Sequence, residues 1–173
     1  MLRVTLALVV LVALAASGCG GGGSTTEEQP TVAAPVHPGG AGPHAARQVA
    51  AYKAAVNDVL ASYSLAQRRA FRVLRRAKEA PAFAAALGRL RRATVRAANR
   101  LEATHPPGAV ASAHRRFVAA FRSLARIIQT AIDARNRSDF SRLRRVGRRL
   151  ASGEFSRPIT QAAKQIDAGL SGR

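Results

Sequence analysis

Apolar residues recur at alternating spacings of four and three from residue 45 onward, which is the repeat of one face of an α-helix. The first such stretch covers residues 45–80, and its recurring positions are Tyr52, Val56, Val59, Tyr63, Ala66, Ala70, Val73 and Ala77. This heptad-like stripe predicts one long helix, and a break near Ser64 is an alternative that the pattern leaves open. Pro81 marks the boundary, because proline fits the first turn of a new helix but not a helix interior.

Two further helices are predicted over residues 81–103 and 109–136, separated by the sharp turn Pro106-Pro107-Gly108. The apolar face of the first includes Phe83, Leu87, Leu90, Thr94, Ala97 and Leu101. The Thr94 hydroxyl is tolerable there, because it can bond a backbone carbonyl one turn back. The second is the most hydrophobic helix, and we expect it at the centre of the core with Arg115, Arg122 and Arg126 pointing away.

A fourth segment begins near residue 139, where Ser138 or Asp139 is expected to cap a helix. One side of this segment is apolar and comprises Phe140, Leu143, Val146, Gly147 and Leu150. The apolar phase does not continue smoothly across residues 153–158. We therefore expect a kink or short break, with Pro158 in the first turn of the resumed helix.

These segments predict an all-α fold, an antiparallel bundle of about four helices over residues 44–173. Aromatic residues make up 5% of the chain and Trp is absent, so the core must be built from Ala, Leu, Val, Ile and a few Phe. Almost no period-two alternation occurs, which argues against strands. A three-helix coil with a loosely attached tail is the alternative.

The N-terminus has the layout of a secretory signal. One positive charge in Met1–Arg3 precedes the apolar run Val4–Ala16, and small residues follow. The segment Ala16-Ser17-Gly18-Cys19 resembles the lipobox of bacterial prolipoproteins, whose commonest residue at the Ala16 position is Leu. The resemblance implies that residues 1–18 are removed and that Cys19 carries fatty acyl chains, palmitate among them. A plain signal cut after Ala13-Leu14-Ala15 and an uncleaved membrane helix are the alternatives.

Residues 19–43 are predicted to be a flexible tether between the lipidated cysteine and the helical domain. Gly, Pro, Ser and Thr dominate this segment and no apolar period occurs in it. Its reach is about 25–30 Å, enough to hold a domain just off a membrane. His37 lies in the segment and His44 lies at its end, and isolated histidines of this kind are usually solvated.

The Pro-Pro turn and its neighbours carry a second resemblance. The segment LEATHPPGAVASAHRRFVAAF, residues 101–121, is similar to a pattern in uncharacterised helical lipoproteins of high-GC Gram-positive bacteria. There, a Leu before a Pro-Pro turn is followed by a helix that carries a His and aromatic residues. The resemblance implies a helical fold and a place on the extracytoplasmic face of the cell membrane, and it implies no activity.

The chain is strongly basic, with 28 Lys and Arg against 9 Asp and Glu, a formal charge of +19. Such a charge attracts polyanions, although a GC-rich genome also favours arginine over lysine. Beside a membrane, the expected partners are anionic lipid, anionic wall polymer or an acidic protein. The arginines we expect to bind anions are Arg89, Arg92, Arg96, Arg100, Arg145 and Arg149.

Motifs for catalysis and for cofactors are missing from the sequence. A di-metal centre needs two Glu-x-x-His motifs, and only Glu102 with His105 fits. Cys-x-x-Cys-His, clustered zinc ligands, Gly-x-Ser-x-Gly and phosphate-binding loops do not occur. His114 is expected to be partly buried and hydrogen-bonded to the Pro-Pro turn. The sequence therefore predicts no enzyme, no cofactor and no metal site.

Three functional hypotheses remain open at this point. The leading one is a lipid-anchored, non-enzymatic envelope protein that acts as an adaptor or binding module with a basic surface. The alternative is a carrier that holds a small apolar ligand in the bundle core. Nucleic-acid binding is suggested by charge alone, and both the export signal and the scarcity of aromatic stacking residues disfavour it.

Overall fold

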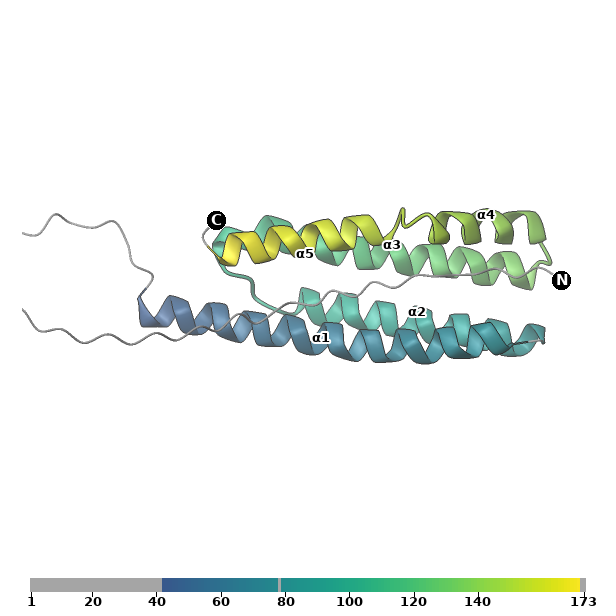
Figure 1. Ribbon diagram of the computed structural model, residues 1–173, viewed down its shortest axis with the longest axis horizontal. Coiled ribbons are helices and arrows are strands. Elements are labelled where there is room, and N and C mark those ends of the chain that lie inside the picture. The colour runs from purple at the N-terminus through teal and green to yellow at the C-terminus, as the bar shows by residue number, and fades with distance from the viewer. Residues whose placement is uncertain (1–41, 78, 172–173) are drawn as a thin grey trace, which may run out of the picture.

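The chain folds into helices, as a computed structural model shows for residues 42–77 and 79–171. The predicted signal peptide, Cys19 and residues 20–41 of the predicted tether lie outside these residues. The described part contains five α-helices and one 3₁₀ turn, and it contains no strand (Figure 1). In chain order the elements are α1 (Pro43–Arg76), α2 (Ala80–Glu102), η1 (Gly108–Val110), α3 (Ala111–Asn136), α4 (Phe140–Ala151) and α5 (Ser156–Leu170).

Prolines and one glycine set most of the helix boundaries. Pro43 is the first residue of α1, so the helix begins one residue before the predicted boundary at residue 44, and His44 lies in its first turn. The first helix ends at Arg76 and not at residue 80, because the ring of Pro81 excludes a continuous helix through the preceding turn. Between α4 and α5 the chain turns at Gly153, whose φ of 72° favours glycine, and Pro158 lies in the first turn of α5 as expected.

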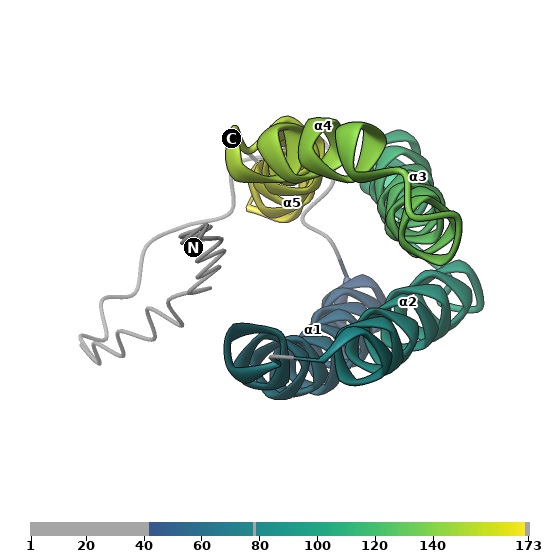
Figure 2. The same cartoon turned by 90° about the vertical axis from the view of Figure 1, so that its right-hand side faces the viewer.

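The helices follow one another in an antiparallel array that is open on one side. Backbone packing joins α1 to α2, α2 to α3, and α3 to both α4 and α5. Seen along the helices, α1 and α2 form one layer, α3 with α4 and α5 forms the other, and α1 does not lie against α4 or α5 (Figure 2). The predicted bundle is confirmed. The alternative of a loose C-terminal tail is wrong, because α4 and α5 both pack on α3.

The core lies along α3, as the hydrophobicity of this segment predicted. Phe117 and Phe121 are each 1% exposed, and their rings meet edge to face with centroids 5.3 Å apart. Tyr63 of α1 contacts Phe121 in the same way, at 5.1 Å, so aromatic packing reaches directly from α1 to α3. Thr94 is fully buried, and its hydroxyl donates to the carbonyl of Leu90 at 2.9 Å, which is the predicted one-turn bond.

The α1 helix runs through Ser64 without a break, as the stripe predicted, since Tyr63 and Ala70 on either side pack against the core. One detail of the apolar pattern differs from expectation. Phe140 was expected on the apolar side of its segment, but it is 54% exposed. It is the first residue of α4, beyond the end of the core, and its ring takes the guanidinium of Arg135 at 5.7 Å instead. Among the described residues, no helix is both long enough and apolar enough to cross a membrane.

Candidate anion-binding surfaces

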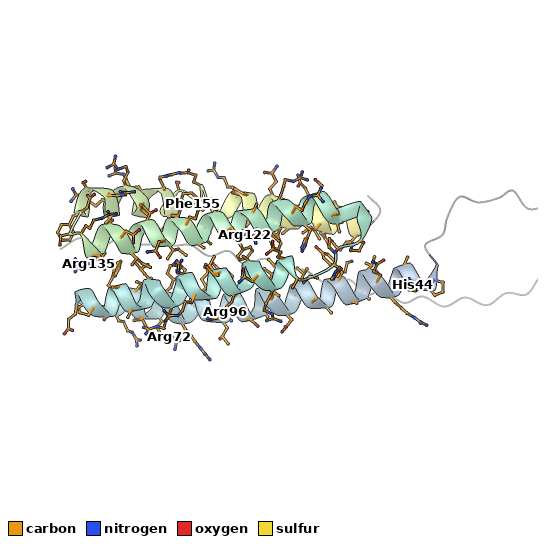
Figure 3. All side chains as sticks on the ribbon, turned by 180° about the vertical axis from the view of Figure 1, so that it is seen from behind. His44, Arg72, Arg96, Arg122, Arg135 and Phe155 are labelled. Atoms are coloured by element: carbon orange, nitrogen blue, oxygen red, sulfur yellow. The ribbon has the colours of Figure 1, made fainter. Side chains whose placement is uncertain are left out.

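The arginines predicted on the second helix form an exposed row along α2. Arg89, Arg92 and Arg96 are exposed, and no ion pair reaches them from the described residues. Figure 3 shows Arg96 on the α1–α2 layer. Arg100 at the end of the row donates to Asp58 of α1 at 2.6 Å, and both side chains stay more than half exposed. Three members of the row are therefore available to an external anion, and the fourth also links two helices.

A second cationic surface covers α4. Its arginines occupy the whole polar arc of this short amphipathic helix, and they are Arg142, Arg144, Arg145, Arg148 and Arg149. Asp139 caps the helix by accepting from the backbone N–H of Arg142 at 2.9 Å. This bond, together with the Ser141 hydroxyl, lowers the pKa of the Asp139 carboxyl. The cap therefore stays ionised, as a helix N-terminus favours.

Arg149 differs from its neighbours on α4, because it is held at the turn into α5. Its guanidinium makes two hydrogen bonds to Glu154, from Nε at 2.9 Å and from Nη2 at 2.5 Å. This pairing lowers the pKa of Glu154 and raises the pKa of Arg149. The same guanidinium lies 5.0 Å from the ring centroid of Phe155. Arg149 thus closes the α4–α5 turn, whereas Arg145 is exposed and unpaired within the described part of the chain.

The six predicted arginines do not share one surface. Arg89, Arg92, Arg96 and Arg100 lie on α2, whereas Arg145 and Arg149 lie on α4, and these helices pack on different sides of α3 (Figure 2). Within residues 42–77 and 79–171 only three ion pairs occur, and the third joins Arg122 to Glu102. Most of the arginine charge of the described bundle is left without an acidic partner in it.

A groove between α2 and α3 brings together arginines that are not among the six predicted to bind anions. Its lining consists of Arg91, Val95, Ala98, Asn99, Arg122, Ala125, Arg126 and Gln129, and its volume is about 360 Å³. Arg122 and Arg126 are exposed, as expected for side chains that point away from the core, and they line the α3 side of this groove. Their spacing of four residues places them one turn apart on one side of α3, which is the only sequence signal for the groove.

A second groove lies between α3 and α5 and is largely occupied by its own polar contacts. Arg116 donates to Ser112 at 3.1 Å and to the Gln165 side chain at 3.0 Å. The remaining lining is mostly apolar and includes Phe155 and Pro158. Its one arginine already donates to two acceptors, so this groove has fewer free donors for an anion than the first groove.

His114 lies in a buried hydrogen-bond network that joins three helices. It is 4% exposed, its Nε2 lies 3.0 Å from the carbonyl oxygen of Leu101, and its Nδ1 lies 2.9 Å from the hydroxyl of Tyr52. The expectation of a partly buried side chain bonded to the Pro-Pro turn is wrong. The histidine reaches instead the last buried carbonyl of α2, because it sits on the core face of α3 just after η1.

The protonation state of this network follows from its donors and acceptors. The Leu101 carbonyl can only accept, so Nε2 carries the hydrogen and Nδ1 accepts from Tyr52. Burial lowers the pKa of His114, and the bond to Leu101 opposes this shift only in part. Burial also raises the pKa of Tyr52 to about 12. Both groups are therefore neutral near pH 7, and the network serves packing.

The described residues contain no group of three or more His, Cys, Asp and Glu side chains placed to hold a metal ion. Comparison of the chain with protein-family models, with curated proteins and with solved structures finds no match. The surfaces themselves are therefore the basis for a functional interpretation.

Proposed function

We propose that this chain is a lipid-anchored, non-enzymatic protein of the cell envelope whose helical domain binds anionic membrane lipid through exposed arginines. The anchor is Cys19, in the lipobox-like segment that ends the apolar leader. The observation that supports lipid binding is the positive charge of the exposed arginines on α2 and α4. The described residues contain only three ion pairs, so most of this charge has no acidic partner there.

Anionic headgroups fit this arrangement better than a single acidic protein patch. Each cationic row runs along one helix, and a membrane surface is extended and uniformly charged, so either row can lie along it. Each arginine that reaches the surface contributes about 1 kcal/mol, so a few engaged side chains hold a tethered domain against it. One acyl chain alone binds weakly, and the basic surface would add to the anchor.

The test is binding of residues 42–173 to vesicles of phosphatidylglycerol and of phosphatidylcholine across a salt series. This segment lacks Cys19, so the measurement reports the helical domain and not the anchor. We expect binding to the anionic vesicles that weakens steeply with salt. No binding at physiological ionic strength would refute the proposal. Tighter binding to teichoic acid or to DNA than to vesicles would reassign the surface to those polymers.

Three charge-matched variants separate a specific surface from total charge. The first replaces Arg89, Arg92 and Arg96 by Gln, the second replaces Arg144, Arg145 and Arg148, and the third replaces Arg68, Arg69 and Arg72 of α1. We expect the α2 or α4 set to lower vesicle affinity by about fivefold for each engaged arginine. Equal losses in all three variants would show that net charge acts without a defined face.

The anchor has a separate test. Full-length chain made in a bacterium that is fed labelled palmitate should incorporate the label, and the Cys19→Ala variant should not. Label in both, or in neither, would rule out lipidation at Cys19.

A further inference from the structure

The groove between α2 and α3 gathers positive charge from two helices around an apolar floor. Arg91 comes from α2, whereas Arg122 and Arg126 come from α3. Side chains of Val95, Ala98 and Ala125 form the floor, and the amide groups of Asn99 and Gln129 complete the lining. The volume of about 360 Å³ is in the range of small-ligand sites.

The charge of the groove is not balanced by its own surroundings. Arg122 pairs with Glu102 at the end of α2, and among the described residues no ion pair reaches Arg91 or Arg126. The carboxylate of Asp133 accepts a hydrogen bond from the amide of Gln129 at 2.6 Å, and it makes no ion pair with the groove arginines. Two guanidinium groups on facing helices are thus left for an external anion.

Arg91 adds a second, independent observation. Its Nε is buried, and it has no hydrogen-bond partner among the described residues. A buried donor without an acceptor is rare in proteins and costs free energy until an acceptor is supplied. The neighbouring Arg92 is exposed and belongs to the arginine row, whereas Arg91 is partly buried and lines the groove.

We propose that this groove binds one phosphate group that carries an apolar substituent. The planar forks of Arg91 and Arg126 match phosphate oxygens in pairs, which lysine could not do. The amide of Asn99 can donate to a further oxygen, and the apolar floor covers the substituent. Such a ligand is either the headgroup of a phospholipid or a soluble phosphate ester. The site is distinct from the exposed rows, and it stands whether or not those rows bind a membrane.

The probe is phenyl phosphate, titrated calorimetrically into the full-length chain in nonionic detergent micelles. Inorganic phosphate and phenol are the control ligands, because each represents one half of the probe. We expect one phenyl phosphate per chain, bound about tenfold more tightly than inorganic phosphate, with no binding of phenol. Equal affinity for the two phosphates would overturn the role of the floor, and the absence of binding would overturn the site.

Two double variants of equal charge locate the site. Arg91→Gln with Arg126→Gln should weaken phenyl phosphate binding at least about tenfold, whereas Arg92→Gln with Arg96→Gln should change it less than about twofold. Equal weakening in both would mean a diffuse field and would refute the groove. Arg91→Lys keeps the charge and removes the fork, so it should also weaken binding, and wild-type affinity would contradict the proposed geometry. Circular dichroism confirms that each variant folds.

A competition arm distinguishes the two sources of the phosphate. Phosphatidylglycerol added to the micelles at a few per cent should displace phenyl phosphate if the natural ligand is a lipid headgroup, with phosphatidylcholine as the neutral control. Retention of phenyl phosphate in its presence would assign the groove to a soluble phosphate ester. All three row variants in the vesicle assay keep Arg91 and Arg126, and the Arg91→Gln/Arg126→Gln variant keeps the rows. Comparison of these variants on the same vesicles therefore separates failure of the groove from failure of the rows.

Discussion

Removal of the Tyr52 hydroxyl tests whether the buried network around His114 stabilises the bundle. In Tyr52→Phe the ring keeps its packing, and the Nδ1 of His114 loses the hydroxyl that donates to it at 2.9 Å. Both side chains are buried, with exposures of 3% and 4%, so water does not replace the hydroxyl without a structural change. A buried acceptor left unsatisfied costs about 1–3 kcal/mol, a large share of the about 5–15 kcal/mol that stabilises a typical domain.

The assay is urea unfolding of residues 42–173 at pH 7.5, followed by circular dichroism. The midpoint should fall and the slope should stay constant, because the same surface is exposed on unfolding. A loss below about 0.5 kcal/mol would refute the reasoning, since it would show that the hydroxyl makes no net contribution in the folded state.

The same network predicts a pH dependence whose sign is fixed by the lowered pKa of His114. Burial makes His114 bind a proton more weakly in the folded state than in the unfolded state, where its pKa is 6.5. As the pH falls below 6.5, the unfolded state takes up the proton first, and the free energy of unfolding decreases until the lower pKa of the folded state is passed. In His114→Phe this dependence between pH 5 and pH 7.5 should be reduced, and an unchanged slope would contradict the assignment.

Three further predictions concern two helical glycines and one helix cap. Gly147→Ala should stabilise the domain by about 0.5–1 kcal/mol, because a Cβ there meets no heavy atom within 4 Å. Gly169→Ala should destabilise it by about 1–3 kcal/mol, because its Cβ would lie 2.7 Å from the buried Val110, and thermal unfolding of the two variants side by side checks both signs. Asp139→Ala should lower the Tm through loss of the cap on the Arg142 N–H, and an unchanged Tm would show that α4 does not need it.

The sequence was sufficient to predict the helices, because their apolar positions are periodic and their ends are marked by residues with fixed backbone preferences. Pro43, Pro81 and Pro158 all lie in first turns, and Gly153 lies at the break between α4 and α5. Phe140 was misplaced because periodicity describes the face of a helix and not the length of the core beneath it. An aromatic residue beyond the end of a partner helix is exposed whatever its phase.

The groove could not be predicted in the same way. Arg91 and Arg126 lie 35 positions apart, and they come together only through the register in which α2 packs against α3. A helical wheel places each of them at the flank of its own apolar face, where a side chain points either to solvent or to a neighbouring helix. The hydrogen bonds of His114 could not be predicted for the same reason, since its partners are Tyr52 on α1 and a carbonyl on α2.

The position at which α1 begins, where the predicted tether would end, constrains how the proposed basic rows could meet a membrane. The α1 helix begins at the end of the bundle where α5 finishes, whereas α4 lies toward the opposite end (Figure 1). With 34 residues, α1 is about 51 Å long, far more than the Debye length of about 8 Å at physiological ionic strength. An upright domain would hold the α4 arginines beyond the attraction of the headgroups. If α4 contributes to membrane binding of the lipid-anchored chain, the domain must therefore lie lengthwise on the surface. The α4 variant of the anchored chain tests this orientation, whereas residues 42–173 have no anchor and can bind through α4 in any orientation.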